Sequence, residues 1–144
     1  MNILDIDKIE LELSSDCNAA CPGCARTQLD GTYEVKNITF KDVQRLFPSK
    51  EYIDGKQFKI CGVLGDPIVN PECSDILTYL AENGGYCVVS TNGSYNTADW
   101  WIRLAQVSHA TSKIKVHFCV DGHRETNHIY LSLIHISEPT RPNE

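Results

Sequence analysis

The sequence contains no basic run, no long apolar segment and no export signal. Its formal net charge is −6 over 144 residues, so the composition gives no support for a surface that binds nucleic acid by neutralising phosphates. No apolar run is long enough to cross a membrane. The first thirteen residues carry four acids and lack the apolar centre of a secretory signal. We therefore predict a cytoplasmic protein without a membrane partner.

The sequence also lacks an even number of cysteines. It has seven, so they cannot all form disulfide pairs within the chain. In a chain without an export signal, cysteines are better interpreted as reduced thiols than as a disulfide framework. Four of the seven lack the spacing of metal ligands, and buried free cysteine behaves as a small apolar residue. We predict that these four are packing residues: Cys61, Cys73, Cys87 and Cys119.

The length and the 42% hydrophobic content suit one globular domain with a core. Apolar periodicity predicts strands at 8–14, 58–64, 86–90 and 114–120, and helices that begin near 39, 73 and 96 or 97. Thr39-x-x-Asp42 has the form of a capping box. Residues 26–37 are polar and turn-rich, and a fourth helix is expected to open within 123–130. This alternation predicts an α/β fold around a parallel sheet, with its first strand near an edge.

In such a sheet the loops that follow the strands gather at one edge, where ligands bind. Here each predicted strand is followed by a distinctive segment. The four segments are Cys17 to Cys24, Gly65-Asp66-Pro67, Thr91-Asn92-Gly93 and Asp121-Gly122. We expect them to converge, although a single glycine-rich turn indicates only a tight turn.

The first segment holds three cysteines, Cys17, Cys21 and Cys24, in the spacing Cys-x3-Cys-x2-Cys. Three thiols so close together suggest a metal site. A structural zinc site needs four protein ligands, whereas an iron–sulfur cubane held by three cysteines leaves one iron for an outside ligand. From the residues alone, two alternatives stay open: a zinc module with Asp16 or a distant cysteine as fourth ligand, and a non-catalytic iron–sulfur module.

The spacing after the first strand resembles the radical S-adenosylmethionine (SAM) superfamily. This resemblance implies a partial (βα) barrel with about four of six βα units. It also implies that Cys17, Cys21 and Cys24 bind a [4Fe–4S] cluster and that the remaining iron holds SAM. The implied enzyme takes one electron from an external reductant, cleaves SAM to methionine and a 5′-deoxyadenosyl radical, and abstracts hydrogen from a substrate that the sequence does not identify.

Further segments carry the same resemblance. Gly62-Val-Leu-Gly65-Asp66-Pro67 is similar to the family's Gly-Gly-Glu-Pro element, which implies that backbone carbonyls and the acid receive the SAM ammonium. Ser90-Thr91-Asn92-Gly93 and Cys119-Val-Asp121-Gly122 resemble the strand-end elements that follow. The SAM contacts implied in this way are Gly62, Gly65, Asp66, Ser90, Asn92 and Asp121. Gly23 stands where the family usually has an aromatic residue, so no adenine contact is assigned.

Residues 131–144 differ in character from the rest of the chain. Leu131-Ser-Leu-Ile-His-Ile-Ser-Glu-Pro-Thr-Arg141 resembles the translation of a transposase-type sequencing adapter. We therefore expect residues 1–130 to be the N-terminal part of a radical SAM core and residues 131–144 to be non-native, with a natural amphipathic tail as the alternative. Residues 121–130 resemble the branch that carries a twitch or SPASM domain. On this interpretation the chain is a fragment with little SAM turnover.

Overall fold

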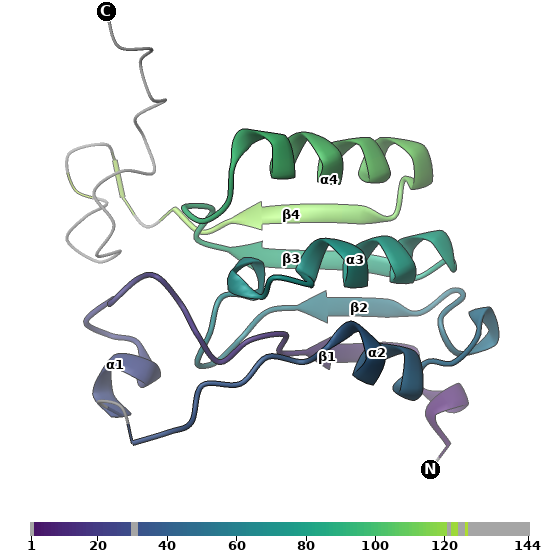
Figure 1. The fold of residues 1–144 in the computed structure, drawn as a ribbon, viewed down its shortest axis with the longest axis horizontal. Coiled ribbons are helices and arrows are strands. Elements are labelled where there is room, and N and C mark those ends of the chain that lie inside the picture. Colours follow the sequence, from purple (N-terminus) through teal and green to yellow (C-terminus); the bar gives the residue numbers. More distant parts are fainter. Residues whose placement is uncertain (1, 30–31, 121, 124–125, 127–144) are drawn as a thin grey trace, which may run out of the picture.

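The computed structural model describes residues 2–29, 32–120, 122–123 and 126. Its strands form one parallel sheet in the order β1-β2-β3-β4 (Figure 1). The strands are β1 (Lys8–Leu11), β2 (Gln57–Ile60), β3 (Tyr86–Thr91) and β4 (Ile114–Phe118). The predicted α/β class, the parallel sheet and the edge position of the first strand are confirmed. Asp121, most of the predicted fourth helix and residues 131–144 lie outside the described residues.

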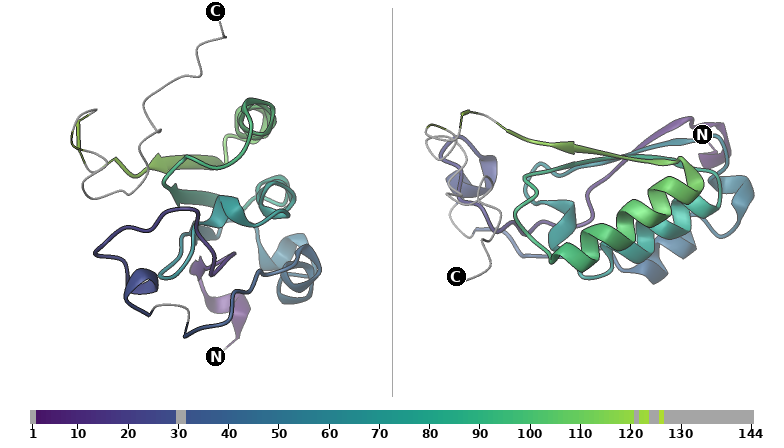
Figure 2. Two further views of the ribbon diagram at one scale, coloured as in Figure 1. Left: turned by 60° about the vertical axis from the view of Figure 1, so that its left-hand side comes forward. Right: turned by 90° about the horizontal axis from the view of Figure 1, so that it is seen from above.

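Three helices cover one face of the sheet (Figure 2). They are α2 (Phe40–Leu46), α3 (Cys73–Glu82) and α4 (Ala98–Thr111). A short helix, α1 (Ala25–Leu29), lies beyond the carboxyl ends of the strands. Short 3-10 helices occur at Ile3–Asp5 (η1), Lys50–Tyr52 (η2) and Pro67–Val69 (η3). Within the part of the chain that the structure describes, no helix has the length and apolar character needed to cross a membrane.

The core lies between the sheet and these three helices. Because strand side chains alternate between the two faces, Phe58, Ile60 and Val89 all point to the helix side, where they are fully buried. The ring of Phe58 meets that of Phe47 edge to face, with 5.2 Å between centroids. Burying a large apolar side chain in this way contributes roughly 1.5–3 kcal/mol. The apolar alternation of the strands therefore decides which face the helices cover.

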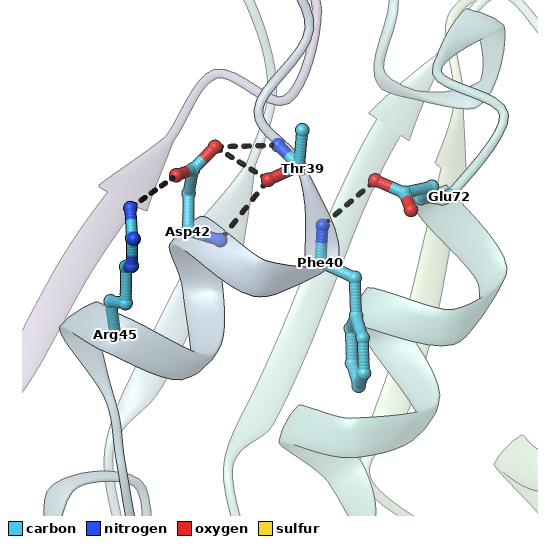
Figure 3. A network of polar contacts seen from close by, with 5 residues as sticks. All are labelled: Thr39, Phe40, Asp42, Arg45 and Glu72. Atoms are coloured by element: carbon cyan, nitrogen blue, oxygen red, sulfur yellow. Dashed lines mark hydrogen bonds and ion pairs between the residues drawn. The ribbon is translucent and has the colours of Figure 1, made fainter.

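Helix α2 begins at the predicted capping box (Figure 3). The Thr39 hydroxyl accepts a hydrogen bond from the Asp42 N–H at 3.1 Å, and the Asp42 carboxylate accepts one from the Thr39 N–H at 3.1 Å. The Glu72 side chain, next to the start of α3, accepts from the Phe40 N–H at 2.8 Å. The first turn of α2 is thus held by its own sequence and also by the neighbouring helix.

Three predicted strands extend too far along the chain, and the last of them, β4, stops at Phe118. The first two strands stop at Leu11 and Ile60, because the chain beyond them makes hydrogen bonds outside the ladder. The carboxylate of Glu12 accepts from the N–H groups of Leu64 and Gly65, at 2.8 and 3.3 Å. The helix α1 is a further difference, since it lies in a region predicted as turns.

The prediction that four cysteines pack in the core is correct for Cys73 and Cys87, which are fully buried. It is wrong for Cys119, which is exposed, and Cys61 is only half-buried. Cys61 directly follows the last residue of β2, and its thiol donates at 3.0 Å to the carboxylate of Glu10, which lines the sheet face that the three helices leave uncovered. Burial raises the pKa of Cys87 to about 12 and also raises that of Cys73.

This difference in burial predicts a difference in thiol reactivity. Iodoacetamide at neutral pH should modify Cys119 in the native protein and should leave Cys73 and Cys87 unmodified, because the thiolate is the reacting form and burial disfavours it. Peptide mapping by mass spectrometry measures the three sites. Both buried thiols should react once guanidinium unfolds the chain. Equal native rates for Cys87 and Cys119 would contradict the described core.

A second prediction concerns Asn70, whose side chain is buried and fully hydrogen-bonded. Its amide donates to the carbonyls of Leu13 and Ile38 at 2.7 and 2.8 Å, and its carbonyl accepts from the Glu72 N–H at 2.8 Å. Asn70→Ala leaves these buried groups without partners and should lower the free energy of unfolding by about 2–4 kcal/mol.

Urea denaturation of Asn70→Ala measures this loss. The control is Asn2→Ala, which removes an exposed asparagine that caps η1. It should cost no more than about 1 kcal/mol. Equal stabilities of the two variants would show that Asn70 does not hold these segments together.

Candidate functional site

The segment from Cys17 to Cys24 lies beyond the carboxyl ends of the strands, next to α1 (Figure 1). All three of its cysteines are half-buried free thiols. The sulfur of Cys17 accepts hydrogen bonds from the Ala19 N–H at 3.4 Å and from the Asn92 amide at 3.5 Å. The sequence therefore brings Cys17 to the edge of the sheet where ligands bind in α/β folds.

Burial raises the pKa of Cys17, and the negative charge of Asp66 raises it further. The hydrogen bond from Ala19 and the positive charge of Arg26 act in the opposite direction. The charges of Asp66 and Arg26 therefore act on this thiol in opposite directions. A bound metal would favour the thiolate, which is the form that coordinates.

No group of three or more His, Cys, Asp or Glu side chains within the described residues is arranged to hold a metal ion. The donor chemistry nevertheless fits an iron–sulfur cluster. Three cysteines lie within eight residues, and the sulfur of Cys17 already accepts two N–H groups, which is the kind of contact that tunes such clusters. Holding a cluster would require the three thiols to draw together.

The carboxylate of Asp66 connects the end of β2 to the end of β3. One oxygen accepts from the Thr91 hydroxyl at 2.7 Å and from the Ile68 N–H at 3.2 Å. The other accepts from the Asn92 N–H at 2.7 Å. Asp66 is only 5% exposed, so these hydrogen bonds replace the water that a buried carboxylate loses.

The side chain of Asn92 joins β3 to the cysteine segment. Its amide nitrogen donates to the Cys17 sulfur and, at 3.2 Å, to the Asn18 carbonyl oxygen. Its own carbonyl oxygen accepts from the N–H and the hydroxyl of Ser94, and Ser94 in turn accepts from the Asn18 amide at 2.9 Å. Asn92 was assigned to SAM from the sequence, and in this structure its side chain binds the cysteine segment.

Gly62 and Gly65 lie where the chain passes close to other backbone. A Cβ atom on Gly65 would overlap the carbonyl oxygen of Ser14, and one on Gly62 would overlap the carbonyl oxygen of Gly65. Next to this contact, the Asp66 N–H donates to the Asp16 carbonyl at 2.7 Å. The turn after β2 is therefore pressed against the residues that lead into the cysteine segment.

Ser90 lies on the sheet face that α2, α3 and α4 leave uncovered, where it pairs with His117 of β4. Both residues line a groove of about 400 Å³ on that face. The lining also includes Lys8, Glu10 and Lys59, and the last two form an exposed ion pair at 3.2 Å. His117 thus lies on the face away from the helices.

Three of the four predicted segments therefore meet at one edge, and the fourth, with Asp121, lies outside the described residues. Sequence reasoning did not single out Arg26, Asn18 and Thr91. Asn18 and Thr91 form hydrogen bonds with the predicted site residues Asn92 and Asp66, and Arg26 donates to Ala19 within the cysteine segment. Asn18 directly follows Cys17, and Arg26 lies two residues after Cys24. Their closeness to the cysteines in the sequence could have marked both as candidate site residues. Thr91 lies within a predicted motif, but its contact with Asp66 depends on the fold.

No family model matches the chain, and comparison with curated proteins gives no match either. Among solved structures, the chain is similar to the crystal structure of BtrN in complex with AdoMet (SAM) and 2-DOIA. The TM-score is 0.59 at 14% identity, and the match covers 77% of this chain and 56% of that chain. A crystal structure of selenomethionine BtrN in an open conformation matches with a TM-score of 0.57 at 14% identity, over 77% and 55% of the two chains.

This chain thus spans little more than half the length of the solved structures that it matches. At such low identity the likeness shows the fold alone. The chain has an α/β fold similar to that of BtrN, and its four-stranded parallel sheet is consistent with a partial βα barrel.

Proposed function

We propose that this chain carries the cluster-binding and SAM-binding edge of a radical SAM enzyme. The observation that carries the proposal is the position of Cys17, Cys21 and Cys24 at the carboxyl edge of a parallel sheet. The likeness of this fold to BtrN, whose crystal structure contains AdoMet, supports it. Cluster and SAM together would supply reductive cleavage of the SAM sulfonium and hydrogen abstraction from a substrate.

In this proposal the three cysteines hold a [4Fe–4S] cluster. Cys17 contributes a thiolate that two N–H groups already stabilise, from Ala19 and Asn92. Cys21 and Cys24 are half-buried in the same segment, so both can turn toward a common centre. A set of three thiolates leaves one iron without a protein ligand, as the binding of SAM requires.

The rest of the edge orients SAM. The negative charge of Asp66 suits the SAM ammonium, and its oxygen that accepts from Asn92 keeps capacity for a further donor. The close backbone at Gly62 and Gly65 offers carbonyl groups nearby. Ser90, on the uncovered face, would contact the ribose or methionine part, and Asp121 stays a predicted contact. An external one-electron reductant and a substrate complete the reaction.

The proposal predicts that the chain takes up about four iron and four sulfide ions after anaerobic reconstitution. Cys17→Ser, Cys21→Ser and Cys24→Ser should each lose most of this uptake, because each removes one of three ligands. Iron and acid-labile sulfide assays, with visible absorbance, measure the result. Cys61→Ser is the control and should load as the wild type does, because it lies outside the segment and its hydroxyl can still donate to Glu10.

Binding of one zinc ion per chain without labile sulfide would contradict this prediction. That result would favour a zinc module, the alternative that the cysteine spacing leaves open. Full cluster uptake by the Cys21→Ser or Cys24→Ser variant would contradict the assignment of ligands.

If Asp66 receives the SAM ammonium, replacing it should weaken SAM binding. Asp66→Asn removes the negative charge and places an amide opposite the Asn92 N–H, so the affinity of the reconstituted protein for SAM should fall by about tenfold or more. Isothermal titration calorimetry under anaerobic conditions measures this affinity.

The matched control is Asp75→Asn, which makes the same change on an exposed residue of α3. It should bind SAM as the wild type does. Thermal unfolding of both variants establishes that they are folded at the temperature of the titration. A folded Asp66→Asn variant with unchanged SAM affinity would show that this carboxylate takes no part in SAM binding.

A further inference from the structure

Arg26 lies in α1, two residues after Cys24, and its guanidinium reaches back into the cysteine segment. One terminal nitrogen donates a hydrogen bond to the carbonyl oxygen of Ala19. Ala19 is itself buried, and its N–H donates to the Cys17 sulfur. The segment between Cys17 and Cys24 therefore folds around the arginine side chain.

The Nε atom of Arg26 is buried and has no hydrogen-bond partner among the described residues. An N–H group of this kind costs roughly 1–3 kcal/mol when it is removed from water and left without an acceptor. Arginine nitrogens are donors only, so the missing partner must be an acceptor. The same guanidinium is hydrogen-bonded to Ala19 in the cysteine segment, so a group bound at that segment is a candidate for the missing acceptor.

The charge of Arg26 also acts on the cysteines. Burial opposes the charged guanidinium, but a hydrogen bond with Tyr33 and the attraction of Cys17 and Cys24 raise the pKa of Arg26. This positive charge is placed on α1, two residues after Cys24, and is hydrogen-bonded to Ala19 between Cys17 and Cys21.

We propose that Arg26 raises the reduction potential of the iron–sulfur cluster by donating its buried Nε–H to a sulfur atom and by placing its positive charge beside Cys17 and Cys24. This inference rests on the proposed function. Reduction adds a negative charge to the cluster, and a nearby cation and N–H···S hydrogen bonds stabilise the reduced form. Arginine keeps its charge at every pH at which the protein is folded, so this contribution is constant.

The test is the midpoint potential of the reconstituted cluster, measured by spectroelectrochemical titration and checked by electron paramagnetic resonance of the reduced protein. Arg26→Gln removes the charge but can still donate to the Ala19 carbonyl, so its potential should be more negative than that of the wild type. Arg26→Lys keeps the charge and loses the Nε–H group, so its potential should lie between the two. Arg45→Gln makes the same charge change at an exposed site on α2 and should leave the potential unchanged.

Wild-type potentials in loaded Arg26→Gln and Arg26→Lys would overturn the inference while leaving the proposed function intact. If Arg26→Gln takes up no cluster, Arg26→Lys decides: a lowered potential supports the inference and an unchanged potential overturns it. A wild-type chain that takes up no cluster would overturn the proposed function, and the inference with it. An equal downward shift in Arg45→Gln would show a general charge effect and would also overturn the role of Arg26.

Discussion

The buried carboxylate of Asp66 binds the end of β3, and the site depends on the contacts of this residue. Its oxygens accept from Thr91 and Asn92, and its own N–H donates to the Asp16 carbonyl just before Cys17. Asp66 therefore connects its own turn to the Thr91-Asn92-Gly93 segment and to the residue that leads into the cysteine segment. In a buried setting such hydrogen bonds are strong, and a missing partner is costly. The arrangement of the cysteine segment is consequently set by a residue about fifty positions later in the chain.

The two faces of the sheet differ in what they contribute to folding. The helix side is apolar and buried, whereas the uncovered side carries Glu10, Lys59, Ser90 and His117. Both side chains of the ion pair between Glu10 and Lys59 are exposed to solvent, and exposed ion pairs contribute little to the free energy of folding. Side chains on this face can therefore be replaced to suit a ligand without weakening the core.

Elements whose determinants are local in the sequence were predictable. The capping box of α2 follows from Thr39 and Asp42, and Thr97 was one of the two residues proposed to cap α4. The contact from Glu72 to the first turn of α2 was not predictable, because 32 residues separate it from Phe40. Likewise α1 has no buried residue in its five positions, so apolar periodicity gave no signal. The candidate site residues could be predicted from their type and spacing in the sequence. Their hydrogen-bond partners could not, because these depend on which loops lie next to one another in the fold.

The strand order has a consequence for how the chain can be made. Among the described strands, each one after β1 pairs with the strand that precedes it in the sequence, so β2, β3 and β4 each find a neighbour that has already been synthesised. Each new βα unit meets a template that the ribosome has already released. The sheet can therefore grow from the N-terminal end during synthesis, and the cysteine segment, which follows β1, emerges before the segments of β2 and β3 that later fix its position.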